Sequence, residues 1–260
     1  QIFISSKLND FFGMIISALM AVPYKVWCRN HNLHHANPNE QDLDPDLDSV
    51  FTFAEERENN KTGLAGFIRR NQHWLYYLLG SFGGISFRLK GLKHLFTDFN
   101  PIPILDVVLL LFGICLWWGT PFVMFPLWKA SIAVLTYTFV AGFYLANVFA
   151  PNHKGMPQLK KGVEYSFFEQ QVITARNVRC GIFLDYVLLG LNYQVEHHLF
   201  PNASRCQMKN LHVLTVKVCK QYNIPFVEMD IIETNKFILH ELKVVASIAR
   251  KEYAEIKQRT

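Results

Sequence analysis

The chain lacks the cysteine patterns that mark disulfide frameworks and cysteine-ligated zinc sites. It has five cysteines, an odd number, and no Cys-x-x-Cys pair. A small secreted scaffold would need paired cysteines, and most structural zinc sites need closely spaced ones. The thiols are therefore expected to be reduced and mostly structural, on a protein that faces the cytosol. They are Cys28, Cys115, Cys180, Cys206 and Cys219.

The sequence also lacks motifs that would assign its chemistry directly. It contains neither the His-Glu-x-x-His of zinc hydrolases nor the Glu-x-x-His of soluble di-iron bundles. The net charge of +5 comes without a basic stripe interleaved with aromatic residues. Because such a stripe marks nucleic-acid binding, no nucleic-acid partner is expected.

Charge is missing from two long stretches. Residues 107–127 and 130–150 contain no Asp, Glu, Lys or Arg. Each stretch is long enough to cross about 30 Å of hydrocarbon as a helix. With a break at Gly119-Thr120-Pro121, they predict a helical hairpin whose membrane spans lie near 104–119 and 125–149.

The rest of the chain predicts an all-α integral membrane protein with a large water-facing part. Half of the residues are hydrophobic, yet 18% are charged. Residues 11–27 and 74–87 are apolar but short or interrupted, which favours interfacial or re-entrant helices. Residues 209–260 are amphipathic, with a turn at Asn223-Ile224-Pro225, and predict a helical cap in the cytosol.

The basic residues predict the orientation in the membrane. Of the 26 Lys and Arg residues, only Lys129 falls within the hairpin. The positive-inside tendency then places residues 28–73 and 151–260 in the cytosol, against anionic membrane lipid. The membrane would be a bacterial inner membrane or the endoplasmic reticulum.

Two short clusters with the same spacing carry the chemistry. Residues 31–35 read His-Asn-Leu-His-His, and residues 194–198 read Gln-Val-Glu-His-His. Positions i, i+3 and i+4 share one helix face, so each cluster is predicted to point three side chains the same way. Imidazole is the commonest metal ligand and suits zinc, copper and iron. The clusters predict a polynuclear metal site with redox activity on a lipid; the alternative is chance polar neighbours on two solvated helices.

The clusters and their surroundings resemble the integral-membrane fatty acid desaturases, a histidine-box family that includes related hydroxylases. The resemblance rests on HNLHH at 31–35, APNHKGMP at 150–157 and GLNYQVEHHLFPNASR at 190–205. A third box that opens with Gln and runs into Leu-Phe-Pro is similar to that of front-end and bacterial acyl-lipid desaturases. The resemblance covers nearly the whole chain and implies a single desaturase domain over 1–260.

By position, the resemblance implies O2-dependent desaturation of a fatty acyl chain at two non-haem iron ions. The metal ligands that it implies are His31, His34 and His35 from the second box, Gln194, His197 and His198 from the third box, and His153 between them. His153 could instead be a membrane-surface residue, and Gln194 could hold a water or a hydrogen bond. The implied partners are a fatty acyl lipid, acyl-CoA or acyl-ACP, O2, and a cytochrome b5- or ferredoxin-type electron donor.

The sequence departs from the family pattern in one respect. A separate first box of the form His-x-x-x-His is missing, and its usual place is a few residues ahead of a segment like that at residue 1. We therefore expect the chain to be truncated at its N-terminus. The 260 residues are not expected to hold a complete di-iron centre.

Acidic residues after the first cluster have the spacing of a calcium loop. They are Asp44, Asp46, Asp48 and Glu55. Ser49 stands where that loop requires glycine, which argues against calcium. A solvated acidic loop is expected, with one carboxylate hydrogen-bonded to a cluster histidine.

Several other polar residues have open interpretations. Glu196 lies off the ligand face of its helix, so a supporting role is expected. Arg176, Asn177 and Asn192 either support the third box or serve as capping and surface residues. The isolated histidines, expected at the surface, are His73, His94, His212 and His240. A basic face, either ordinary positive-inside charge or a docking surface for an acidic electron donor, would comprise Lys160, Lys161, Arg176, Arg179, Arg205 and Lys209.

Two rival functions remain on the same scaffold. One is a fatty acyl or lipid hydroxylase, which the sequence does not distinguish from a desaturase. The other is a non-catalytic membrane paralogue.

Overall fold

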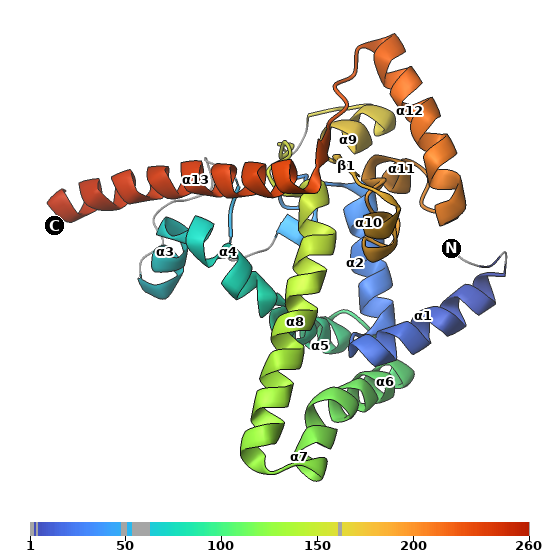
Figure 1. The fold of residues 1–260 in the computed structure, drawn as a ribbon, viewed down its shortest axis with the longest axis vertical. Helices are drawn as coiled ribbons and strands as arrows, with labels where there is room; N and C mark the ends of the chain where they lie inside the picture. The colour runs from blue at the N-terminus through green and yellow to red at the C-terminus, as the bar shows by residue number, and fades with distance from the viewer. Residues whose placement is uncertain (1–2, 4, 48–50, 54–62, 161–162, 260) are drawn as a thin grey trace. The chain divides into compact units, whose positions relative to one another are not determined.

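The protein is mostly helical in the computed structural model, which describes residues 3, 5–47, 51–53, 63–160 and 163–259 (Figure 1). A two-stranded parallel ladder, β1 with β2, adds an element that the sequence analysis did not predict. The helices are α1 Ser6–Met20, α2 Tyr24–Ala36, η1 Pro45–Leu47, α3 Gly63–Arg70, α4 Gln72–Ser81, α5 Gly83–Thr97, α6 Ile104–Ile114, η2 Cys115–Gly119, α7 Thr120–Met124, α8 Leu127–His153, α9 Phe167–Ile173, α10 Ile182–Val187, α11 Gln194–Leu199, η3 Arg205–Gln207, α12 Met208–Tyr222 and α13 Ile231–Arg259. The strands are β1 Asn177–Arg179 and β2 Glu228–Asp230.

Contacts divide the chain into two compact units. The first comprises Gln1–Asn32 and Leu78–Ala146, and the second comprises Leu33–Tyr77 and Asn147–Thr260. The boundaries fall inside α2, α4 and α8. Each unit is described by itself below.

The first unit contains the apolar hairpin. Two helices, Ile104–Met124 and Leu127–His153, are long and apolar enough to cross a membrane, and only 11% and 17% of an apolar 18-residue stretch in each is buried. The second helix leaves this unit after Ala146. The helix continues through Pro121, and the chain turns at Phe125, which is later than the break predicted at Gly119-Thr120-Pro121. The π-helical turn η2 ends at Gly119, just before α7, so Pro121 falls in the first turn of α7, where a proline is tolerated.

Close backbone approaches hold the helices of this unit together. A methyl group on Gly142 of α8 would stand 1.7 Å from the carbonyl oxygen of Ser81, and one on Gly113 of α6 would stand 2.1 Å from that of Ala18. Across the hairpin, the Trp118 indole N–H donates to the Thr138 hydroxyl at 3.1 Å. These contacts depend on glycine at the two crossing points.

The first apolar segment bends sharply. α1 and α2 meet at 105°, forming either a broken span or a re-entrant loop. The backbone N–H of Lys25 donates to the buried carboxylate of Asp106 at 2.7 Å, which fixes the start of α2 against α6. The prediction of a re-entrant or interfacial segment over 11–27 agrees with this bend.

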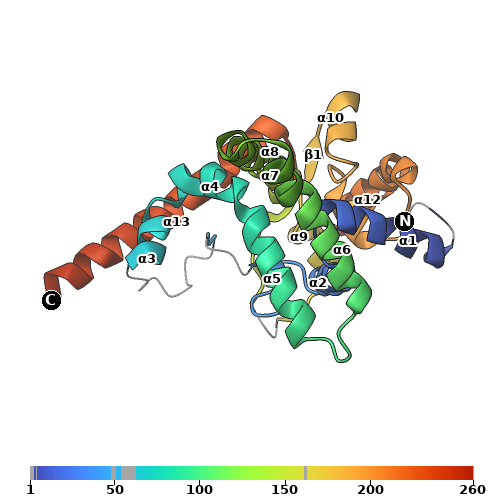
Figure 2. The same cartoon turned by 90° about the horizontal axis from the view of Figure 1, so that it is seen from below.

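The second unit packs its helices around two small cores. Val172 of α9, Val195 of α11 and Cys219 of α12 form one core. Val148 of α8 and Leu188, which follows α10, form the other with Val178 of β1, and β1 and α10 lie side by side (Figures 1 and 2). The two cores thus set α11 between α9, α12 and β1, and α11 carries the third histidine cluster.

The C-terminal part is two helices, as predicted. α12 ends where Asn223 adopts a left-handed conformation, at φ 56°, and α13 begins after β2. The ladder pairs Val178 with Met229, residues far apart in sequence. Three-residue strands give no alternating pattern, so this pairing was not predictable from the sequence.

Candidate metal centre

Three elements deliver the histidines. α2 carries His31, His34 and His35, α8 ends at His153, and α11 carries Gln194, His197 and His198. All of these except His31 belong to the second unit, because the boundary between the units falls inside α2 after Asn32.

Within that unit, His34, His153 and His198 form a buried trio. The Nε2 atom of His153 lies 3.3 Å from that of His34 and 3.0 Å from that of His198. Each ring therefore points the same nitrogen at one common position. The three residues come from three helices that lie far apart in the sequence. The spacing within each cluster therefore does not predict that these three histidines meet.

The outward nitrogens of the trio face hydrogen-bond acceptors. His34 Nδ1 lies 2.9 Å from the Asp44 carboxylate, and His153 Nδ1 lies 3.0 Å from the Thr174 carbonyl oxygen. His198 Nδ1 lies 2.8 Å from Oε1 of Gln171, whose amide nitrogen donates to a backbone carbonyl. All three partners are oxygen atoms that can only accept a hydrogen bond. Each ring must therefore donate from a protonated Nδ1.

In a neutral ring that is protonated on Nδ1, the inward Nε2 atom carries a lone pair. The Nε2 atoms of His34 and His198 face that of His153 at 3.3 and 3.0 Å, and lone pairs this close repel unless a proton or a metal cation lies between them. Burial, together with the neighbouring histidines, holds the pKa of His198 well below its ordinary value and keeps its ring neutral. Neutral imidazoles with Nδ1–H held by a carboxylate or carbonyl are typical metal ligands, so the trio fits a metal ion.

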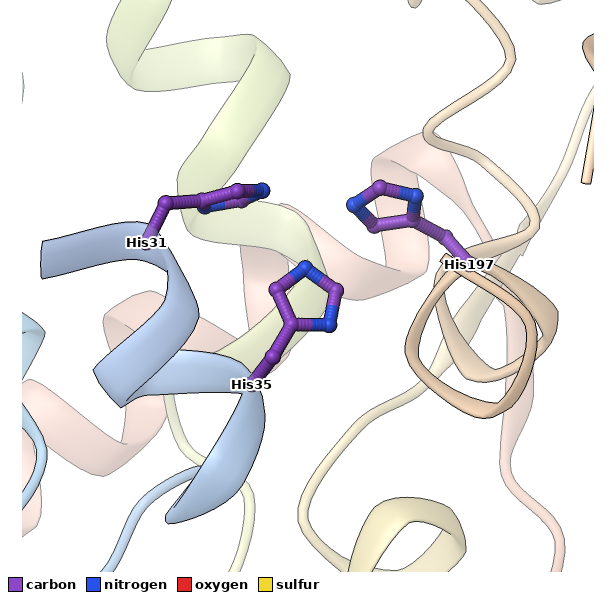
Figure 3. Close-up of side chains that lie close together, drawn as sticks. All are labelled: His31, His35 and His197. Carbon is purple, nitrogen blue, oxygen red and sulfur yellow. The ribbon is translucent and has the colours of Figure 1, made fainter. Parts of the chain in front are cut away.

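His35 and His197 form a second pair beside the trio. Their ring centroids are 4.7 Å apart, and ligand nitrogens of the two lie within 4.8 Å. The His35 ring also stacks on His198, with centroids 4.2 Å apart. His31 lies one helical turn before His35 on the same face of α2 (Figure 3).

This arrangement corrects one expectation from the spacing. His34 and His35 were predicted to point the same way, as were His197 and His198. Instead, His34 and His198 join His153, whereas His35 faces His197. Successive residues of a helix are about 100° apart, so neighbouring histidines can serve different groups.

Gln194 lies at the edge of the trio. Its Oε1 accepts a hydrogen bond from the Asn152 amide at 2.9 Å, and its own amide nitrogen lies 2.9 Å from His153 Nε2. Asn152 also donates to the Val148 carbonyl, which fixes the direction of its amide. Gln194 therefore presents a donor to a histidine lone pair, in agreement with the hydrogen-bonding alternative.

The acidic loop supports the trio. The buried Asp44 accepts from His34 and also from the backbone N–H of Asn39, at 2.8 Å. The expectation that one carboxylate of this loop bonds a cluster histidine is thus confirmed. Asp46 is exposed and lies 3.6 Å from His34. Asp48 and Glu55, which belong to the same expectation, lie outside the described residues.

A polar network fixes the third cluster. The fully buried Glu196 accepts from the Asn177 amide at 2.6 Å and contacts His212 Nδ1 at 3.2 Å. Asn177 Oδ1 in turn accepts from the backbone N–H of Val195 at 3.0 Å. Glu196 thus has the expected supporting role, and the contacts of Asn177 favour support of the third box over a capping or surface position. Asn192 is buried, and its carbonyl accepts from Val178 N–H at 2.9 Å.

Two residues differ from their expected positions. Arg176 was counted in the basic face, but it is fully buried and donates to the Pro151 and Lys154 carbonyls. His212 was expected at the surface, but it is half-buried against Glu196. Neither position has a signal in the sequence, because both contacts join segments distant along the chain. The same holds for Gln171, Thr174 and Asn152.

Two apolar helices of membrane-spanning length and a buried histidine trio that could hold a metal ion are the features of a histidine-rich membrane protein. Comparison with known proteins gives the family. The model of the fatty acid desaturase family matches residues 3–229, so the chain belongs to that family. Non-haem iron is the metal that this family implies.

The chain is similar to several named desaturases. It is 29% identical over 267 residues to an acyl-lipid (9-3)-desaturase of Physcomitrium patens, with 98% of this chain and 50% of that protein covered. It is 28% identical to a Delta(8)-fatty-acid desaturase of Borago officinalis, covering 95% and 59%. It is 27% identical to a Delta(5) fatty acid desaturase of Caenorhabditis elegans, covering 96% and 59%. The chain thus spans between half and three-fifths of the length of these relatives. No solved structure matches it.

Proposed function

We propose that the chain carries the iron site of an enzyme that desaturates a fatty acyl chain with O2 and two external electrons. The observation that carries this proposal is the convergence of the Nε2 atoms of His34, His153 and His198 in a buried position. Family membership supports the reaction, and the apolar hairpin supports a substrate held in a membrane.

Completed by a first histidine box of the family pattern, the centre would hold two iron ions. His34, His153 and His198 are proposed to bind one. His35 and His197 are proposed to bind the other with His31, which is assigned from its register on α2. Gln194 is proposed to stand beside the first ion. Non-haem iron, when bound, supplies the O2 activation that removes two hydrogens from an unactivated acyl chain.

The surrounding residues would orient the ligands and keep the site dry. Asp44, Gln171 and the Thr174 carbonyl hold the three Nδ1 protons outward, so the Nε2 lone pairs need no reorganisation on metal binding. Burial of the trio excludes water from this side of the site. Asn152 sets the direction of the Gln194 amide.

The proposed placement is a single desaturase domain in the membrane. The hairpin would span the bilayer, and the histidine-bearing segments would face the cytosol, as the basic residues predict. The proposed substrate is a lipid-linked acyl chain, as in the names of the acyl-lipid relatives, with acyl-CoA and acyl-ACP as the other carriers. An acidic cytochrome b5- or ferredoxin-type protein is proposed as the donor.

Fatty acid analysis tests the reaction. The full-length natural protein would be expressed in a host with a defined lipid composition, beside a His153→Ala variant. We expect a new fatty acid with two hydrogens fewer in the wild type only. A product with one added oxygen would assign a hydroxylase instead, and no product with either protein would favour the non-catalytic paralogue.

A further inference from the structure

α10 exposes an unusual amount of apolar surface for its length. Four large apolar side chains in and just after this helix are between 62% and 78% exposed: Ile182, Phe183, Tyr186 and Leu189. The opposite side of the segment is anchored, because Leu188 is buried against Val148 and Val178. Clustered apolar exposure of this kind marks a surface that contacts a partner or a membrane.

The length of α8 indicates what covers this surface. α8 has 27 residues, which is about 40 Å at 1.5 Å per residue. Its uncharged residues 130–150 are about 30 Å long, which matches the thickness of the hydrocarbon core. Val148 lies near the end of that stretch, at the edge of the hydrocarbon core, and packs on Leu188, which sets the α10 segment at the same depth.

The charges of α10 suit this location. The one acidic residue of the segment, Asp185, is paired with Arg205 at 2.6 Å. The Arg205 guanidinium also lies 4.1 Å from the centre of the Tyr186 ring. A tyrosine stacked with an arginine is an amphipathic pair, and such pairs favour the boundary between headgroups and acyl chains.

We propose that α10 and Leu189 form an anchor that inserts into the cytosolic headgroup layer of the bilayer. Residues 190–193 connect this anchor directly to α11, so it would hold the third histidine cluster at the membrane surface. The inference rests on the membrane placement in the proposed function and is independent of metal binding and of the reaction.

Photo-crosslinking in lipid nanodiscs tests the anchor. Phe183 would be replaced with the photoreactive analogue p-benzoylphenylalanine, in discs of phosphatidylcholine and phosphatidylglycerol. The matched control carries the same analogue at Val213 on α12, which is 64% exposed but lies beside exposed lysines Lys209 and Lys217. We expect lipid adducts at position 183 in several times the yield found at position 213.

Equal adduct yields at positions 183 and 213 would overturn the proposal. So would a crosslink from position 183 to a second copy of the chain, which would assign the surface to self-association. If the position 183 variant is not recovered in discs, the adduct yield with the analogue at Ile182 would be compared with that at position 213 instead. Because iron-free protein gives the same readout, a chain that proves inactive still tests the anchor.

Discussion

At the residue scale, the proposed site depends on which ring nitrogen of each histidine carries the proton. The buried Asp44 fixes this for His34, and backbone N–H groups of Asn39 and Asp46 hold its carboxylate in place. Replacing Asp44 with Asn keeps the shape but removes one acceptor and the charge. We expect metal affinity, measured by Co²⁺ titration, to fall about 10- to 100-fold.

The exposed neighbour Asp46 provides the matched control. Its carboxylate is 3.6 Å from His34, and its side chain is 60% exposed. Asp46→Asn should leave the Co²⁺ affinity close to that of the wild type. Equal losses in the two variants would show that general negative charge, and not the Asp44 hydrogen bond, supports the site.

His212 is expected to stabilise the fold in a pH-dependent way. Its hydrogen bond to Glu196 raises its pKa, although partial burial acts in the opposite direction. The folded state therefore holds this proton more tightly than the unfolded state. The stabilisation is complete below the ordinary value near 6.5 and is lost as the pH rises through the raised pKa.

We predict that the difference in melting temperature between the wild type and His212→Gln decreases as the pH rises. Wild type should melt above His212→Gln by a larger margin at about pH 6 than at about pH 8.5. Thermal unfolding in detergent measures both, with His240→Gln on α13 as the matched variant. A gap that widens with rising pH would contradict the proposed pair with Glu196.

The residues of the site were predictable only in part. Repeated i, i+3, i+4 spacing identified the two histidine clusters, because a helix turns that spacing into one face. It did not predict the division into His34 with His198 and His35 with His197, which depends on how α2 and α11 meet. Gln171 and Thr174 were not predictable either, since their contacts join segments with no spacing relation.

At the element scale, the packing of α8 against the end of α4 depends on a close crossing at Gly142. A methyl group there would collide with the Ser81 carbonyl, a backbone atom that cannot rotate away. Gly142→Ala is expected to destabilise the protein by about 1–3 kcal/mol, which thermal unfolding in detergent would record as a lowered melting temperature.

Gly119→Ala is the control for this crossing. A methyl group at Gly119 meets its first neighbour at 3.8 Å, an ordinary contact. Alanine also has the higher helix propensity, so Gly119→Ala should be neutral or stabilising. If both variants melted at the wild-type temperature, this would contradict the close approach of Gly142 to the Ser81 carbonyl.

The elements themselves followed from the sequence where the signal was local. Uncharged runs predicted the two long apolar helices, and Asn223-Ile224-Pro225 predicted the break between α12 and α13. The turn of the hairpin was placed too early, because Pro121 is tolerated after a π-helical turn. The β1–β2 ladder was missed, because each strand has three residues and the pairing is long-range.

At the scale of the whole molecule, apolar helices and a buried histidine site occur together in one chain of the fatty acid desaturase family. We propose that the second unit binds iron through the inward-facing imidazoles of the trio. The site forms from segments around residues 34, 153 and 198, so it should respond to single substitutions that leave the apolar helices unchanged.

The most direct test is the iron content of the chain purified without oxygen. We predict bound iron in the wild type, loss of most of it in His153→Ala, and full retention in His240→Ala, which alters an exposed histidine on α13. If all three proteins held the same amount of iron, or if the wild type held none, iron binding by the trio would be contradicted.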